Sequence, residues 1–257
     1  MFHRRLCMEC GRCIDVCPEG AIRPDAALGL LTDRDACTAC GACVEACVYG
    51  ARELVGRTWS VGDVMSIIRR DRRFYDNSGG GVTVSGGEPL SQCPFVREIL
   101  RACRREAIHT AIETCGMGSW ECLESLLPWL DLVFFDIKHI DEEGHRKLTG
   151  ASNAPILENL VRLAEAFAHG RIILRIPYVP GCNDETESLE GIIRFAAELE
   201  RIERVEIMPY HRFGTSKYDG LGLDYTLGDL EPVPAQEIGS LTKLGEQYDV
   251  EIRIDAA

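Results

Sequence analysis

The sequence has no apolar run that approaches the roughly 20 residues needed to span a bilayer. The N-terminus reads Met-Phe-His-Arg-Arg-Leu-Cys and has no signal-peptide core. Basic charge is not in excess either, because 28 Lys and Arg against 41 Asp and Glu give a formal net charge of -13. Nucleic-acid binding needs a basic face. These absences predict a cytoplasmic protein that neither crosses a membrane nor binds nucleic acid.

Cysteine, in contrast, is abundant, at 13 of 257 residues. Without a secretion signal thiols stay reduced, so metal binding is favoured over disulfides. Eight cysteines precede residue 48 and the other five are scattered. Of these five, we expect Cys93, Cys103, Cys122 and Cys182 to be buried small hydrophobes or spectators, and we assign no role to Cys115.

The cysteine-rich segment contains an internal repeat. Two runs have the spacing C-x2-C-x2-C-x3-C, and a proline follows only the first. In this spacing three thiolates face one cuboidal 4Fe-4S cluster and the fourth points to the neighbouring cluster. The predicted ligand sets are Cys7, Cys10, Cys13 and Cys47 for one cluster, and Cys37, Cys40, Cys43 and Cys17 for the other.

Zinc knuckles or a disulfide knot are the alternative explanation of these runs. Zinc sites usually combine two C-x2-C pairs that lie far apart, which two four-cysteine runs do not match. We therefore expect a ferredoxin-like module with two 4Fe-4S clusters over residues 1–57.

From Thr58 onward the sequence alternates between helical and strand patterns. Ser60 and Asp63 predict a capping box, and Pro94 predicts the first turn of a later helix. Further helices are expected at 155–169 and 184–201, and strands at 82–85, 108–113, 132–137, 172–176, 205–208 and 250–254. Strands that alternate with helices pair in parallel, so residues 58–257 are expected to form an α/β domain, a (β/α) barrel or part of one.

Polar or glycine-rich residues follow five of these strands. They occupy residues 85–89, 113–116, 136–138, 175–177 and 209–211. In parallel α/β folds, functional groups gather at the carboxyl ends of the strands. We call these five segments strand tips. Each tip alone could be a surface turn, but five together are hard to explain by packing, so they predict a functional site.

The tip Ser-Gly-Gly-Glu-Pro at 85–89, together with the cysteine segment, resembles the activating enzymes of glycyl-radical enzymes in the radical S-adenosylmethionine (SAM) superfamily. The stretches 78–88, 108–116, 131–138 and 208–211 carry the same resemblance. It implies reductive cleavage of SAM to methionine and a 5'-deoxyadenosyl radical, which takes hydrogen from a glycine of a partner glycyl-radical enzyme. It also implies an electron donor of the flavodoxin or ferredoxin type, auxiliary clusters that relay the electron, and a monomeric chain.

The resemblance further implies a SAM pocket at the strand tips. Gly86, Gly87 and Glu88 would bind the amino group, the glycines by close backbone approach and the glutamate by its carboxylate. Lys138 and Arg175 would face the methionyl carboxylate. The other implied pocket residues are Asp136, Ile137, a closing His211, and Glu113, where relatives have an aspartate that helps to hold a monovalent cation.

One motif of the superfamily, C-x3-C-x2-C, is absent from these 257 residues. That loop follows the first barrel strand and holds the cluster that cleaves SAM. The resemblance therefore implies a partial barrel that lacks its first strand, no catalytic residue in this chain, and a third 4Fe-4S cluster only in a full-length form.

Two hypotheses follow. The first, which we favour, is an activating enzyme whose recorded chain lacks the first strand and its loop and is inactive by itself. The second is an iron-sulfur electron carrier or partner-binding protein with a degenerate barrel.

Overall fold

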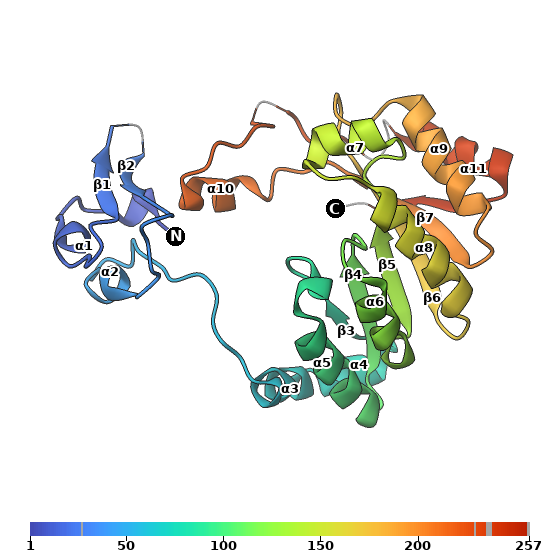
Figure 1. Ribbon diagram of the computed structural model, residues 1–257, viewed down its shortest axis with the longest axis horizontal. Coiled ribbons are helices and arrows are strands. Elements are labelled where there is room, and N and C mark those ends of the chain that lie inside the picture. Colours follow the sequence, from blue (N-terminus) through green and yellow to red (C-terminus); the bar gives the residue numbers. More distant parts are fainter. Residues whose placement is uncertain (27, 229, 235–237, 256–257) are drawn as a thin grey trace. The chain divides into compact units, whose positions relative to one another are not determined.

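The structure, a computed structural model, describes residues 1–26, 28–228, 230–234 and 238–255 (Figure 1). The chain divides into two compact units, Met1–Thr58 with His211–Glu231, and Trp59–Tyr210 with Pro232–Ala257. The first unit thus includes a segment that the sequence pattern assigns to the barrel. None of the described helices is both long enough and apolar enough to cross a membrane.

The first unit repeats one structure within each cysteine run. Gly11 and Gly41 have φ values of +74° and +83°, a conformation that favours glycine, and a single helical turn follows each. The sequence repeat is therefore a structural repeat. Its elements are η1 (Arg4–Leu6), α1 (Arg12–Asp15), β1 (Ile22–Asp25), β2 (Gly29–Thr32), α2 (Ala42–Glu45) and α10 (Thr215–Leu221).

The second unit is built on a six-stranded parallel sheet with the order β3-β4-β5-β6-β7-β8. Six strands were expected near these positions, and the partial barrel is confirmed. Among the described residues β3 pairs only with β4, so β3 forms one edge of the sheet. The strands are β3 (Gly81–Val84), β4 (His109–Thr114), β5 (Leu132–Asp136), β6 (Arg171–Tyr178), β7 (Ile202–Pro209) and β8 (Ile252–Ile254).

Local sequence signals explain where several helices of this unit begin. The Ser60 hydroxyl accepts from the main-chain N–H of Asp63, whose carboxylate accepts from the N–H of Ser60, so the predicted capping box is confirmed. Pro94 lies in the first turn of α5, as predicted. The helices are α3 (Val61–Arg70), α4 (Arg72–Ser78), α5 (Cys93–Arg105), α6 (Trp120–Leu126), α7 (Glu142–Thr149), α8 (Ala154–Ala166), α9 (Thr186–Ala197) and α11 (Thr242–Tyr248), with 3-10 turns η2 (Pro89–Gln92), η3 (Leu127–Trp129) and η4 (Gly239–Leu241).

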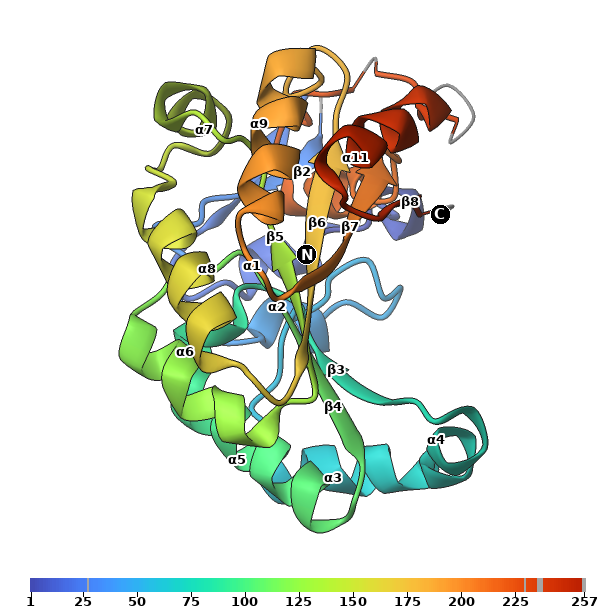
Figure 2. The same cartoon turned by 90° about the vertical axis from the view of Figure 1, so that its right-hand side faces the viewer.

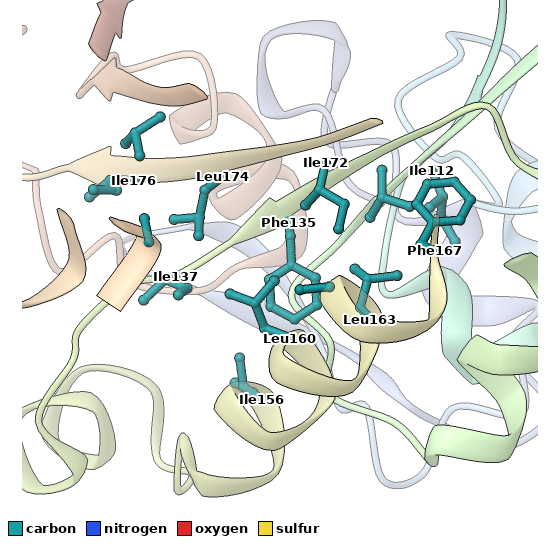
Figure 3. Close-up of a cluster of buried hydrophobic side chains, with 14 of the residues drawn as sticks. Ile112, Phe135, Ile137, Ile156, Leu160, Leu163, Phe167, Ile172, Leu174 and Ile176 are labelled. Atoms are coloured by element: carbon teal, nitrogen blue, oxygen red, sulfur yellow. The ribbon is translucent and has the colours of Figure 1, made fainter. Parts of the chain in front are cut away.

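Helices cover one face of the sheet, as Figures 1 and 2 show for α5, α6, α8 and α9. Phe135 and Leu174 of the strands pack on that side with Leu160 and Leu163 of α8 (Figure 3). Because successive side chains of a strand alternate between faces, the residues between these core positions point the other way. That opposite face carries Ala111, Leu132 and Ile173 and then, toward the carboxyl ends, charged residues.

The scattered cysteines do not all behave as expected. Cys93 and Cys122, which we expected to be buried small hydrophobes or spectators, are joined by a disulfide with Cα atoms 5.9 Å apart. That expectation was wrong because the first turn of α5 lies beside α6, a proximity that the sequence does not reveal. Cys103 is fully buried, as expected.

Candidate cofactor sites

Two cavities of the first unit are lined by cysteines from both runs. Each takes three cysteines from one run and the fourth from the other, which is the grouping predicted from the spacing. One cavity is lined by Cys7, Cys10, Cys13 and Cys47, and the other by Cys37, Cys40, Cys43 and Cys17.

The donors of these cavities fit an iron-sulfur cluster better than a single ion. Within the described parts of the chain, no three His, Cys, Asp or Glu side chains are close enough to share one metal ion. A zinc ion would need each thiolate sulfur at about 2.3 Å, whereas a cuboidal cluster spreads its four cysteines around a larger body. Four soft thiolates per cavity are the ligand set that such a cluster requires.

The environment of Cys47 favours the thiolate that a cluster binds. Burial raises the pKa of this thiol, but the main-chain N–H groups of Arg52, Tyr49 and Ala51 outweigh that effect and lower its pKa overall. For Cys43, in contrast, burial is the largest effect and raises the pKa.

Glu88 ties the glycine-rich tip after β3 to the tip after β4. One carboxylate oxygen accepts from the Thr114 hydroxyl at 2.6 Å and from the main-chain N–H of Leu90 at 3.1 Å. The other accepts from the main-chain N–H and the thiol of Cys115, at 2.9 and 3.1 Å. These four contacts occupy about four acceptor positions, which is what a carboxylate offers. Glu88 therefore fixes the shape of the site, and its contact with an ammonium group stays a prediction.

The neighbouring glycines leave backbone exposed at this tip. Gly86 has φ of +121°, and a Cβ built at Gly86 or Gly87 would meet no atom within 4 Å. Both residues are exposed. The loop thus offers open space and backbone polar groups, as the resemblance implies for the SAM amino group.

Arg175 lies between two carboxylates on the face of the sheet opposite helices α5, α6, α8 and α9. Its Nη1 donates to Glu113 at 2.7 Å and its Nε donates to Glu206 at 3.1 Å. The guanidinium stacks 3.7 Å from the centroid of the Phe134 ring. Glu206 also accepts from Arg204, at 2.7 and 3.0 Å. Charge pairs therefore hold Arg175 in one orientation on this face.

Asp136 occupies the same face in the neighbouring strand β5, directly opposite Arg175 in the register. Burial raises the pKa of its carboxyl group to about 6, although Lys138 and Arg175 act in the opposite direction. The nearby Glu113 adds to the rise. A cationic ligand beside Asp136 would stabilise its ionised form and so lower its pKa again.

The predicted pocket residues Ile137, Lys138 and His211 differ in what they can contribute to the site. The Ile137 side chain is 1% exposed and packs in the core under the helices (Figure 3), so only its backbone belongs to the tip. The carbonyl oxygen of Lys138 accepts from Asn183 at 2.9 Å. His211 belongs to the first unit, and its closing role stays a prediction.

Sequence reasoning missed Glu206 and Arg204 as members of the charged cluster. Glu206 falls inside the predicted strand at 205–208, between two core residues, Val205 and Ile207. Successive side chains of a strand point to opposite faces of the sheet, so the buried Val205 and Ile207 would have placed Glu206 on the opposite face.

Replacing Asp136 with asparagine is expected to stabilise the second unit near neutral pH. A carboxyl group whose pKa is higher in the folded than in the unfolded chain destabilises the fold once it is ionised. The gain should be about 1 to 3 kcal/mol above about pH 6 and should vanish below about pH 4. Urea unfolding of the wild type and of Asp136→Asn across this range measures the difference.

The matched control is Asp131→Asn, just before the same strand. Asp131 accepts from the main-chain N–H of Thr110 at 2.9 Å and from Arg104 at 2.5 Å, and these contacts lower its pKa despite burial. This variant should lose about 1 to 2 kcal/mol. Equal effects of both substitutions would contradict the assigned environment of Asp136.

Replacing Glu88 with glutamine is expected to destabilise the second unit by about 1 to 3 kcal/mol, because an amide nitrogen would face donors. Glu158→Gln on α8 is the control, since Glu158 makes an exposed ion pair with Arg162 and should change stability by less than about 0.5 kcal/mol. Thermal unfolding checks both variants. A Glu88→Gln chain as stable as the wild type would show that the four contacts do not hold the tip.

Two family models match the chain. The model described as the Radical SAM superfamily matches residues 39–196. The model described as a 4Fe-4S dicluster domain matches residues 6–52. The second match contains all eight cysteines that line the two cavities.

Several curated proteins are similar over most of the chain. Isethionate sulfite-lyase activating enzyme of Oleidesulfovibrio alaskensis is 41% identical over 224 residues, which cover 86% of this chain and 72% of that protein. Trans-4-hydroxy-L-proline dehydratase activating enzyme of Clostridioides difficile is 39% identical over 257 residues, which cover 99% of this chain and 84% of that protein. Among solved structures, a domain of pyruvate-formate lyase-activating enzyme from Bacteroides vulgatus has a TM-score of 0.57 at 26% identity and covers 69% of this chain and 99% of that domain.

Proposed function

Because the chain belongs to the radical SAM superfamily, and within it to the activating enzymes of glycyl-radical enzymes, we propose that it serves the reductive cleavage of SAM and hydrogen abstraction from a glycine of a partner enzyme. The observation that carries this proposal is the charged face at the carboxyl ends of β4 to β7. There Arg175 is held between Glu113 and Glu206, and Glu88 fixes the adjacent glycine-rich tip.

The residues of this chain would bind and orient SAM. The backbone at Gly86 and Gly87 would meet the methionyl amino group. Arg175 and Lys138 would meet the methionyl carboxylate, because a guanidinium and an ammonium both donate to carboxylates. Asp136 would line the same pocket. SAM bound at an open cluster would supply the 5'-deoxyadenosyl radical after accepting one electron and releasing methionine.

The eight cysteines of the first unit would hold two auxiliary 4Fe-4S clusters. These clusters would relay an electron from a donor of the flavodoxin or ferredoxin type. The superfamily's C-x3-C-x2-C motif does not occur among these 257 residues. We therefore expect these residues alone to bind about eight irons and to cleave no SAM.

The test compares this chain with one extended at its N-terminus by a strand and a C-x3-C-x2-C loop. Both are reconstituted with iron and sulfide without oxygen and incubated with SAM and dithionite, and 5'-deoxyadenosine is quantified. We expect 5'-deoxyadenosine only from the extended chain. An extended chain that holds about 12 irons but forms no 5'-deoxyadenosine would overturn the proposal and favour an iron-sulfur electron carrier. Cleavage by the 257 residues alone would overturn the need for the loop.

A further inference from the structure

Arg52 is a buried cation in the cysteine-rich module. Its residue is 5% exposed, and it forms an antiparallel bridge with Phe2 near the start of the chain. Its guanidinium lies 4.6 Å from the centroid of the Phe2 ring, and its Nη1 donates to the Thr32 hydroxyl at 2.8 Å. Ring stacking and this hydrogen bond fix the direction of the side chain.

Two other nitrogens of this guanidinium have no partner among the residues that the structure describes. Nε and Nη2 of Arg52 are buried and make no hydrogen bond with any of them. An always-charged group buried with unpaired donors costs several kcal/mol, so such groups are normally paired. The burial of the Arg52 guanidinium is therefore explained if an acceptor outside the polypeptide forms hydrogen bonds with these nitrogens.

The surroundings of Arg52 identify that acceptor. Arg52 lines the cavity of Cys7, Cys10, Cys13 and Cys47 and also the cavity that contains the other four cysteines. Of the described residues that line these two cavities, it is the only one common to both. Cluster sulfides and cysteine thiolates are anionic acceptors, and hydrogen bonds to them are a main control of cluster potential.

We propose that Arg52 bridges the two clusters, with its guanidinium donating charged hydrogen bonds to sulfur atoms of both and raising both reduction potentials. This inference rests on the proposed cluster sites. Each one-electron reduction adds a negative charge to a cluster, so a nearby buried cation stabilises the reduced state more than the oxidised state. One side chain thereby shifts both potentials in the same direction, so the difference between them changes little.

The experiment compares reconstituted wild type with Arg52→Gln and, as control, Arg23→Gln. Arg23 is an exposed residue of β1 in the same unit, so its replacement removes the same charge from the surface. Iron is counted first, and each cluster is then titrated against potential by electron paramagnetic resonance. In Arg52→Gln the equilibrium constant for reduction should fall about tenfold at both clusters, a shift of about 59 mV to lower potential. Arg23→Gln should change it by less than about twofold, because exposed charges are screened.

A second variant, Arg52→Lys, covers the case in which glutamine prevents folding. Lysine keeps the charge, but its compact ammonium lacks the planar fork of arginine, so at least one of the two potentials should fall. Loaded variants in which both potentials match wild type, or move only as in Arg23→Gln, would overturn the Arg52 inference and leave the cluster sites standing. A wild-type chain that binds no clusters would overturn both.

Discussion

A chain in which Cys7 and Cys47 are both replaced by alanine is expected to lose about four of about eight irons, no more than either single variant loses. These two cysteines line the same cavity although 40 positions separate them in the sequence. Once one ligand is lost and its cluster falls away, removal of a second ligand of that cluster has no further effect. Such non-additivity identifies groups that act as one unit.

The double variant to compare with this one replaces Cys7 and Cys17. They belong to one run in sequence but line different cavities. Replacing both by alanine should therefore empty both sites, with a loss of about eight irons. Cys182→Ala, outside the module, should keep the full amount. If the Cys7 and Cys17 pair loses only about four irons and the Cys7 and Cys47 pair loses about eight, each run binds its own cluster and the crossed assignment is wrong.

Replacing Arg175 with methionine is expected to destabilise the second unit by about 3 kcal/mol or more. The side chains of Arg175 and Glu206 are only 16% and 12% exposed, so removing the cation leaves the carboxylates of this face partly buried and less well paired. Arg175 also acts to lower the pKa of the neighbouring Asp136, so its removal costs less once that carboxyl group is protonated. The loss should accordingly shrink as the pH falls toward 4, and chemical denaturation at several pH values measures it.

Arg171→Met provides the matched control on the same strand. Arg171 is exposed and lies 3.7 Å from Glu203, a geometry typical of weak surface pairs. We expect a change of less than about 0.5 kcal/mol that depends little on pH. A loss in Arg175→Met no larger than in this control would contradict the charge cluster.

Much of the fold follows from local patterns in the sequence. The capping box at Ser60 and the first turn of α5 at Pro94 depend on residues within one turn of each other, so local spacing predicts them. The grouping of Cys47 with the first cysteine run also follows, because the run has a fixed geometry. Strand tips are predictable as a set because carboxyl ends of parallel strands lie at one edge.

What could not be predicted depends on contacts between distant elements. The burial of Arg52 arises from the pairing of its backbone with Phe2, 50 positions earlier. Three of the four contacts of Glu88, those with Thr114 and Cys115, arise from the approach of the next strand tip. They show that Glu88 fixes the loop, and its contact with an ammonium group stays a prediction. Arg52 has no distinctive local pattern, and the pattern around Glu88 does not show which groups of the next strand tip contact its carboxylate.

The most direct test of a SAM site at these strand tips is the dissociation constant of SAM for the N-terminally extended, cluster-loaded chain. Arg175→Met should raise that constant at least about tenfold, a loss of about 1.4 kcal/mol, at a temperature where the variant remains folded. Arg171→Met should leave it unchanged. Equal affinity in the wild type and in folded Arg175→Met would show that SAM does not bind where Glu113, Arg175 and Glu206 meet.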